Sequence, residues 1–320
     1  MTLLLLSLAV TSLPPDAVLS LPTYGAIKGT QYAGFANGTA DGKNKLFYWF
    51  AECDCGNAPD VPFLLWLNGG PGASSLTGFL LEKLGPLSVT LNSTLVDNPD
   101  RLTKNYHVLV FDNPVGSGFS YSAAEPPAYV TSEYEMRTQL LRALRGFFAM
   151  HPEYKANPFW VTGESYAGHY VPNIAWEIAV NATEIPIQGV AIGNGMYNMK
   201  LQYNTVGAMA FASGVIDEQV YAQEQAREAS CLAMIDASPA TAVRCVLPSE
   251  QEYRVPWAPL LSTAHRLSDA VFSFMPLRCL IHRACTARTR PCTGSTRRTG
   301  QVAKYSTTMS ALRTAPSLIL

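Results

Sequence analysis

The sequence predicts an α/β protein built on a mainly parallel sheet, with helices on both faces and an incomplete C-terminal end. Two observations support this fold class. Segments with helical periodicity follow short apolar runs, and this alternation is typical of parallel strands connected by helices. Each apolar run leads into a turn rich in Gly, Asn or Pro and has the composition of a buried strand; the runs are 63–67, 107–112, 159–162 and 187–192.

The remaining elements can be placed in order along the chain. Residues 31–52 are predicted to form a hairpin, because two strand-like runs flank an Asp-Gly turn. Ser132 and Glu135 form a capping box that starts an amphipathic helix over 132–150. Helical segments are also expected after the turn at 163–168, as far as about 180, and over 205–230.

The composition is that of a folded protein with a substantial core. The chain has 320 residues, 48% apolar and 15% charged, which excludes a mainly disordered protein. The net charge of −1 gives no overall field for nucleic acid or an anionic membrane. Residues 270–320 differ, since they contain seven Arg, one Lys and no acidic residue. We therefore expect a domain over 21–257 and a divergent basic tail over 258–320, disordered or mispredicted, with no nucleic-acid-binding module.

The N-terminal residues have the pattern of a secretory leader. The apolar run 3–10 is too short to cross a bilayer, which needs about 20 residues, so we expect a signal peptide over about 1–20 and no transmembrane anchor. Three glycosylation sequons agree with a secretory route that ends in a vacuole, a lysosome or outside the cell; they begin at Asn37, Asn92 and Asn181.

The chain contains seven Cys, an odd number. Cys53 and Cys55 are expected to be too close in sequence to pair with each other, whereas Cys231 and Cys245 could close a loop. The Cys and His residues of the basic tail do not have the spacing of a zinc site. The sequence therefore predicts no metal site and no cofactor.

A nucleophile elbow is the strongest chemical signal. A predicted strand ends in Gly163-Glu164-Ser165-Tyr166-Ala167, and a helix follows. Such a tight turn exposes the Ser hydroxyl, and small residues two positions before and after it let strand and helix approach each other. The alternative is an ordinary strand-to-helix turn that contains a Ser. We predict that Ser165 is a nucleophile.

A Gly-rich turn earlier in the chain fits the same chemistry. Acyl transfer needs two N–H groups that face the developing oxyanion. The N–H of Tyr166 lies at the start of the helix, and Gly69 and Gly70 follow the buried strand at 63–67. Gly-Gly-Pro-Gly is also common in turns without a catalytic role.

Four segments together closely resemble the serine carboxypeptidases: WLNGGPGASS (66–75), FDNPVGSGFSY (111–121), FWVTGESYAGHYVP (159–172) and GVAIGNG (189–195). The resemblance runs from about Tyr32 to about Val220. It implies an α/β-hydrolase fold in a secretory or vacuolar protein. It also implies a hydrolase that removes C-terminal residues at acid pH from peptides or proteins with a free C-terminus, through an acyl-enzyme on Ser165.

The resemblance also assigns roles to individual residues. It makes Gly70 and Tyr166 the two oxyanion donors. Two neighbouring carboxyl groups do not both ionise easily, so one keeps a proton and can donate a hydrogen bond to a substrate carboxylate. In this family such a pair helps to hold the substrate's C-terminus, and the residues that match this group are Asn68, Gly69, Glu164 and Glu82.

The sequence departs from the family pattern in several places. Ala73 stands where the family has a Cys, and Lys83 is an extra residue before Leu84-Gly85-Pro86. The family's triad Asp and His lie more than a hundred residues after the Ser, and no matching His motif follows the resemblance here. The end of the chain therefore has the character of a truncation, a shifted reading frame or a mispredicted exon.

These departures leave three functions open. The first is a serine carboxypeptidase, either active or inactive as this chain. The second is a carboxypeptidase-like acyltransferase that uses the same Ser. The third is a non-catalytic secreted protein with the same fold. His169 lies only one helical turn after Ser165, whereas a base normally approaches from a separate loop, and no downstream His or Asp can be assigned. The oligomeric state also remains open.

Overall fold

The computed structural model describes residues 13–202 and 205–237. The chain divides after Met196 into two compact units, which are considered separately. The predicted tail at 258–320 and the predicted partner Cys245 lie outside the described residues, as do residues 1–12 of the predicted leader.

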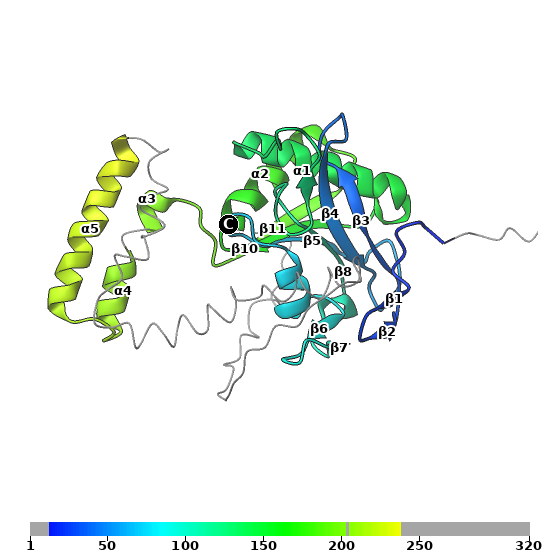
Figure 1. The fold of residues 1–320 in the computed structure, drawn as a ribbon, viewed down its shortest axis with the longest axis horizontal. Helices are drawn as coiled ribbons and strands as arrows, with labels where there is room; N and C mark the ends of the chain where they lie inside the picture. Colours follow the sequence, from blue (N-terminus) through cyan, green and yellow to red (C-terminus); the bar gives the residue numbers. More distant parts are fainter. Residues whose placement is uncertain (1–12, 203–204, 238–320) are drawn as a thin grey trace, which may run out of the picture. The chain divides into compact units, whose positions relative to one another are not determined.

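The first unit is built on a seven-stranded sheet in its described part (Figure 1). Its order is β11-β10-β5-β8-β4-β3, and β9 also pairs with β4. The four strands from β11 to β8 run parallel, whereas β4 is antiparallel to both β8 and β3. The predicted strands and hairpin are thus confirmed, with bounds β3 Gln31–Asn37, β4 Asn44–Ala51, β5 Phe63–Leu67, β8 His107–Phe111, β9 Tyr121–Ser122, β10 Phe159–Glu164 and β11 Ile187–Gly193.

Two long helices cover one face of this sheet (Figure 1). The side chain of Ser132 caps α1 (Glu133–Met150) by accepting a hydrogen bond from the N–H of Glu135 at 3.2 Å, as predicted. Helix α2 (Ala167–Asn181) begins directly after the Ser165 turn. The apolar stripe of α1, which includes Leu140, Leu144 and Phe147, packs with α2 and the sheet into one core.

Shorter elements cover the other face. A five-residue π-helix, η1 (Thr77–Leu81), packs with a hairpin of β6 (Leu87–Val89) and β7 (Leu95–Asp97). Their apolar side chains form a second core with Trp49 and Val108 of the sheet. Other short elements are β1 (Ser20–Leu21), β2 (Gly25–Ala26), η2 (Leu102–Lys104) and η3 (Pro152–Tyr154).

The segment just after the predicted leader's apolar run is packed on the first unit. Asp16 accepts hydrogen bonds from the Tyr48 hydroxyl at 2.6 Å and from His151 Nε2 at 2.7 Å. The N–H of Val18 donates to the carbonyl of Gln31 at 2.9 Å. The leader predicted over about 1–20 includes these residues, so its removal near residue 20 would break the contacts of Asp16 and Val18. The three sequon Asn residues, Asn37, Asn92 and Asn181, are all exposed.

Replacing Leu144 by Ala is expected to lower the free energy of unfolding by about 2–5 kcal/mol, because Leu144 is fully buried and the change leaves a cavity. Leu91 offers a matched control, since it is fully exposed and its replacement by Ala should change the value by less than about 0.5 kcal/mol. Denaturant unfolding of both variants measures the difference. Equal effects would contradict the assignment of α1 to the core.

The second unit is helical in its described part, with α3 (Met199–Gln202), α4 (Val206–Ala212) and α5 (Glu218–Ala237). The helix predicted over 205–230 is interrupted, because Gly214 adopts a left-handed φ of 67° and ends α4. The carboxylate of Glu228 in α5 accepts the N–H of Gly207 at 2.9 Å, which joins α4 to α5. None of the described helices in either unit combines the length and apolar character needed to cross a membrane.

One prediction about the cysteines is wrong. Cys53 and Cys55 form a disulfide in the loop that follows β4. The loop turns sharply, with a φ of 81° at Gly56, and brings the two Cα atoms to 5.0 Å, within the range that a disulfide can bridge. Short sequence separation therefore did not prevent pairing.

Candidate active site

The turn between β10 and α2 holds Ser165 in an unusual backbone conformation. Its φ is 59°, in the left-handed region that non-Gly residues seldom occupy. Its N–H donates to the carbonyl of Gly193 at 3.0 Å, and its carbonyl accepts from Met196 at 2.9 Å. These bonds fix the turn while Ser165 itself stays exposed.

Small residues on either side of Ser165 make this turn possible. A Cβ at Gly163 would lie 2.5 Å from the carbonyl oxygen of Leu67 and 2.7 Å from the Cβ of Ala167. A Cβ at Gly168 would lie 2.4 Å from the carbonyl oxygen of Met196. Strand β10, helix α2 and the segment after β11 thus approach too closely for larger side chains, as the elbow motif predicts.

The Gly-rich loop after β5 lies directly against this turn. A Cβ at Gly69 would lie only 2.3 Å from the backbone nitrogen of Tyr166. Gly70 has a φ of 111°, which favours glycine. Within the described residues, neither the N–H of Gly70 nor that of Tyr166 donates a hydrogen bond. The two predicted oxyanion donors therefore come from loops in contact and have no acceptor among the described residues.

Replacing Gly69 by Ala is expected to lower the free energy of unfolding by about 1–3 kcal/mol, because the new methyl group meets the backbone of Tyr166. The matched control is Gly146→Ala in α1, where the added Cβ meets only Ala36 at 3.6 Å and should stabilise the helix by about 0.5–1 kcal/mol. Thermal or denaturant unfolding measures both changes. Similar effects of the two substitutions would show that the loops do not touch.

The buried side chain of Asn68 occupies the centre of a partly buried polar cluster beside the turn. Its Oδ1 accepts hydrogen bonds from Trp66 Nε1 at 2.8 Å and from the N–H of Gly78 at 3.0 Å. Because these donors fix the amide orientation, its Nδ2 points to Glu164 Oε1 at 3.1 Å and to Glu82 Oε1 at 3.4 Å. The structure thus brings together three of the residues that the sequence assigned to substrate-carboxylate binding.

The two carboxyl groups of this cluster interact with each other. Loss of hydration and the neighbouring Glu164, through its charge and a hydrogen bond, raise the pKa of Glu82 to about 8, which the hydrogen bond from Asn68 opposes in part. Glu82 is exposed as a whole residue, so it is the carboxyl end that lies in the cluster. Glu82 therefore keeps its proton through the acid and neutral range.

The segment that precedes the predicted extra residue, Lys83, is a π-helix, η1. In η1 the N–H of Glu82 donates to the carbonyl of Thr77, five residues earlier, at 3.0 Å. A π-turn contains one residue more than an α-turn. The next residue, Lys83, has a left-handed φ of 64°. The wide turn therefore ends where Glu82 enters the polar cluster.

Asp112, which the sequence analysis did not single out, is buried and binds the segment that follows the Gly-rich loop. Asp112, at the end of β8, accepts hydrogen bonds from Ser74 Oγ at 2.6 Å and from the N–H groups of Ser75 at 2.9 Å and Phe119 at 2.8 Å. Burial raises its pKa to about 6, against these hydrogen bonds. Its place in the FDNPVGSGFSY motif was the available signal. Trp66 and Gly78, which orient Asn68, were also missed.

The described histidines have other contacts. His107 lies at the start of β8, at the opposite end of the parallel strands from Ser165, and His151 bonds to Asp16. His169 stacks on the ring of Tyr166, with 4.7 Å between ring centroids. None of the three forms a hydrogen bond with Ser165 in the described part of the chain, which also holds no group of three residues arranged to bind a metal.

A strand, a strained Ser turn, a helix and a Gly-rich loop at the carboxyl ends of parallel strands define an α/β-hydrolase. A family model for serine carboxypeptidase matches residues 22–255 of the chain. The chain therefore belongs to the serine carboxypeptidase family.

Individual relatives agree with this family. The chain is 37% identical over 211 residues to serine carboxypeptidase S10 family member 1 of Dictyostelium discoideum, covering 65% of this chain and 50% of that protein. It is 39% identical over 203 residues to the probable serine carboxypeptidase CPVL of Homo sapiens, covering 62% and 42%. The chain thus spans half or less of the length of these two relatives.

A solved structure also resembles this fold. Kex1Δp, a prohormone-processing carboxypeptidase from Saccharomyces cerevisiae, superposes with a TM-score of 0.58 at 25% sequence identity. The match covers 67% of this chain and 49% of the yeast protein.

Proposed function

We propose that this chain carries the nucleophile half of a serine carboxypeptidase site, which cleaves C-terminal peptide bonds through an acyl-enzyme on Ser165. The observation that carries the proposal is the exposed Ser in a left-handed turn beside a Gly-rich loop, with one N–H group on each segment that donates to no described residue, that of Tyr166 and that of Gly70. In this reaction the Ser oxygen attacks the carbonyl carbon, and the N–H groups of Gly70 and Tyr166 bind the oxyanion. When the adduct collapses, the peptide C–N bond breaks and the C-terminal amino acid leaves with a proton on its amine; water then hydrolyses the Ser ester and releases the shortened peptide.

The carboxyl cluster supports cleavage at the free C-terminus. A protonated Glu82, oriented by Asn68, donates a hydrogen bond to a substrate carboxylate, whereas two ionised groups would repel it. Retention of that proton up to about pH 8 suits binding under acid conditions. The substrates are peptides or proteins with a free C-terminus, and the family's routing supports a secretory location with glycosylation at Asn37, Asn92 and Asn181.

The general base of the reaction is assigned to no described residue. A Ser without its base reacts slowly, so covalent labelling is a more sensitive assay than turnover. Because the oxyanion donors and the Ser act on any acyl group, a carboxypeptidase differs from an acyltransferase in whether water or an alcohol takes up the acyl group.

A labelling experiment tests the proposal. The full chain is incubated with a peptidyl phosphonate that ends in a free carboxylate and with its amidated counterpart, over pH 4–9. We expect the adduct on Ser165 by peptide mapping, with faster labelling by the free carboxylate. Absence of any adduct at every pH would indicate a non-catalytic protein. Equal labelling by the two probes would reject the carboxylate site.

A further inference from the structure

The Cys53–Cys55 disulfide lies far from the Ser165 turn. It follows β4, whose last residue Ala51 pairs with Val108 at the start of β8, whereas Ser165 follows the carboxyl end of β10. We propose that this disulfide is a thiol–disulfide exchange site that reacts with low-molecular-weight thiols, and that the sulfur of Cys55 is the one attacked.

The bond is poorly suited to a stabilising role. It closes a ring around a single residue, Asp54. A disulfide stabilises a fold mainly by restricting the unfolded chain, and this effect grows with the length of the loop it closes. A ring of this size restricts the unfolded chain least, so the fold does not depend on keeping it closed.

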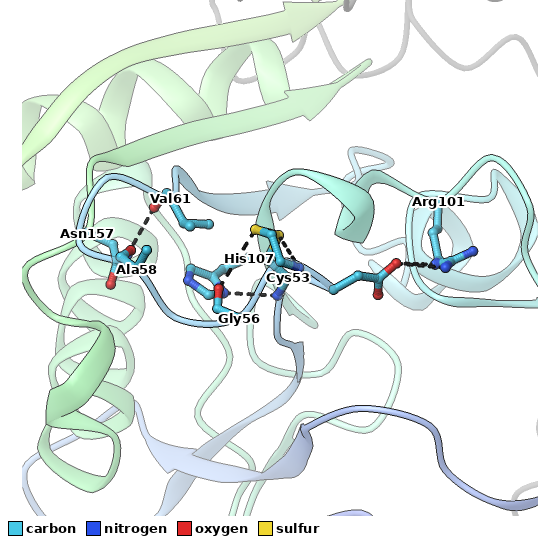
Figure 2. The surroundings of a disulfide bond; sticks show 9 residues. Cys53, Gly56, Ala58, Val61, Arg101, His107 and Asn157 are labelled. Atoms are coloured by element: carbon cyan, nitrogen blue, oxygen red, sulfur yellow. Dashed lines mark hydrogen bonds and ion pairs between the residues drawn. A yellow bond between two sulfur atoms is a disulfide. The ribbon is translucent and has the colours of Figure 1, made fainter.

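The loop is held in place by contacts other than the disulfide (Figure 2). The N–H of Cys53 donates to His107 Nδ1 at 3.1 Å, and burial lowers the pKa of His107 to about 4, which keeps the ring a neutral acceptor. Arg101 forms an ion pair with the carboxylate of Asp54 at 2.7 Å. The N–H of Gly56 donates to the carbonyl of Cys53 at 2.9 Å. The two sulfur atoms therefore stay neighbours after reduction, which allows the bond to form again.

The two sulfurs differ in their access to solvent. Cys53 is only 3% exposed, whereas Cys55 is an exposed residue. The N–H of Cys55 also donates to the sulfur of Cys53 at 3.2 Å. A hydrogen bond to a thiolate stabilises it, so Cys53 is the better leaving group and Cys55 the accessible electrophile.

The exchange balances as follows. A thiolate attacks the sulfur of Cys55, a mixed disulfide forms, and the electron pair of the broken bond passes to Cys53 as its thiolate. A second thiolate attacks the external sulfur of the mixed disulfide and releases Cys55. Two thiols are oxidised to one disulfide, and the protein disulfide is reduced to two thiols that take up the two protons.

The wild-type full chain tests this proposal with glutathione as the probe. After equilibration in glutathione buffers, samples are acid-quenched and alkylated, and the peptide that contains both Cys is analysed by mass spectrometry. We expect reduction without loss of circular dichroism, and at least about tenfold more glutathione on Cys55 than on Cys53. A pair that stays oxidised until the chain unfolds, or adducts shared equally, would overturn the proposal.

Two single substitutions provide an independent test. Cys53→Ser leaves the exposed sulfur and is expected to form a lasting mixed disulfide with oxidised glutathione. Cys55→Ser leaves the buried sulfur and should react at least about tenfold more slowly. Equal rates in two variants with native circular dichroism would show that burial of Cys53 does not direct the attack.

Discussion

Replacing Ser165 by Ala is expected to abolish covalent labelling at the elbow and to lower any release of C-terminal residues by several powers of ten. The substitution removes the attacking oxygen but keeps the backbone bonds to Gly193 and Met196. Its unfolding free energy should change little, since Ser165 is exposed. Intact-mass analysis after phosphonate treatment, together with a peptide release assay, measures both effects.

Ser132→Ala provides the control for this prediction. Ser132 caps α1 and takes no part in the site, so the substitution should cost about 1 kcal/mol of stability and leave labelling unchanged. If Ser165→Ala were still labelled at the same rate as wild type, another residue would be the nucleophile.

A pH-dependent preference for free C-termini is the second large effect that we expect. Above about pH 8 Glu82 loses its proton, and binding of a peptide carboxylate must then take a proton up. Affinity should therefore fall about tenfold per pH unit above that value. Ser165→Ala prevents turnover, so calorimetry with this variant can compare a free peptide with its amide, for which no such fall is expected.

Glu82→Gln, added to Ser165→Ala, tests whether Glu82 holds this proton. Gln can donate a hydrogen bond at every pH, so the affinity for a free carboxylate should become nearly independent of pH. An unchanged pH profile in the double variant would assign the proton to a group other than Glu82.

The raised pKa of Glu82 also makes the stability of the fold depend on pH, and the direction of this dependence follows from the shift. The folded-state pKa of Glu82 lies above its value of about 4.5 in an unfolded chain, so folding retains a proton between these two values. Stability contributed by Glu82 is therefore full below about pH 4.5 and falls as pH rises towards 8. Between about pH 4.5 and pH 8 we expect the free energy of unfolding to fall by about 1–2 kcal/mol, a small value because solvent screens the partly exposed Glu82. Glu82→Gln should remove this fall.

Local sequence predicted the elements whose shape depends on neighbouring residues. The apolar run 63–67 and its Gly-rich turn form β5 and the loop after it, and the elbow motif at Ser165 has the left-handed backbone that the motif requires. The capping box predicted the start of α1 at Ser132. In each case the physical cause lies within a few residues of the element.

Features that depend on several distant segments could not be predicted. The orientation of Asn68 is set by Gly78 of η1, and the Gly-rich loop is held by Asp112, which directly follows β8. The Cys53–Cys55 bond was rejected because sequence separation alone does not show how sharply the loop turns at Gly56. The break at Gly214 was missed because a single Gly inside a predicted helical segment does not by itself show that the chain turns there.

The π-helix before Lys83 has a consequence for how this scaffold varies. Each residue of a regular helix turns the chain by roughly 100°, so deleting one residue here rotates the acid at position 82 away from its partner. We expect such a deletion to weaken the proton sharing while leaving every side chain of the cluster chemically unchanged. The number of residues in the turn before Glu82, rather than their identity, would then set the pH range over which the carboxyl pair holds its proton.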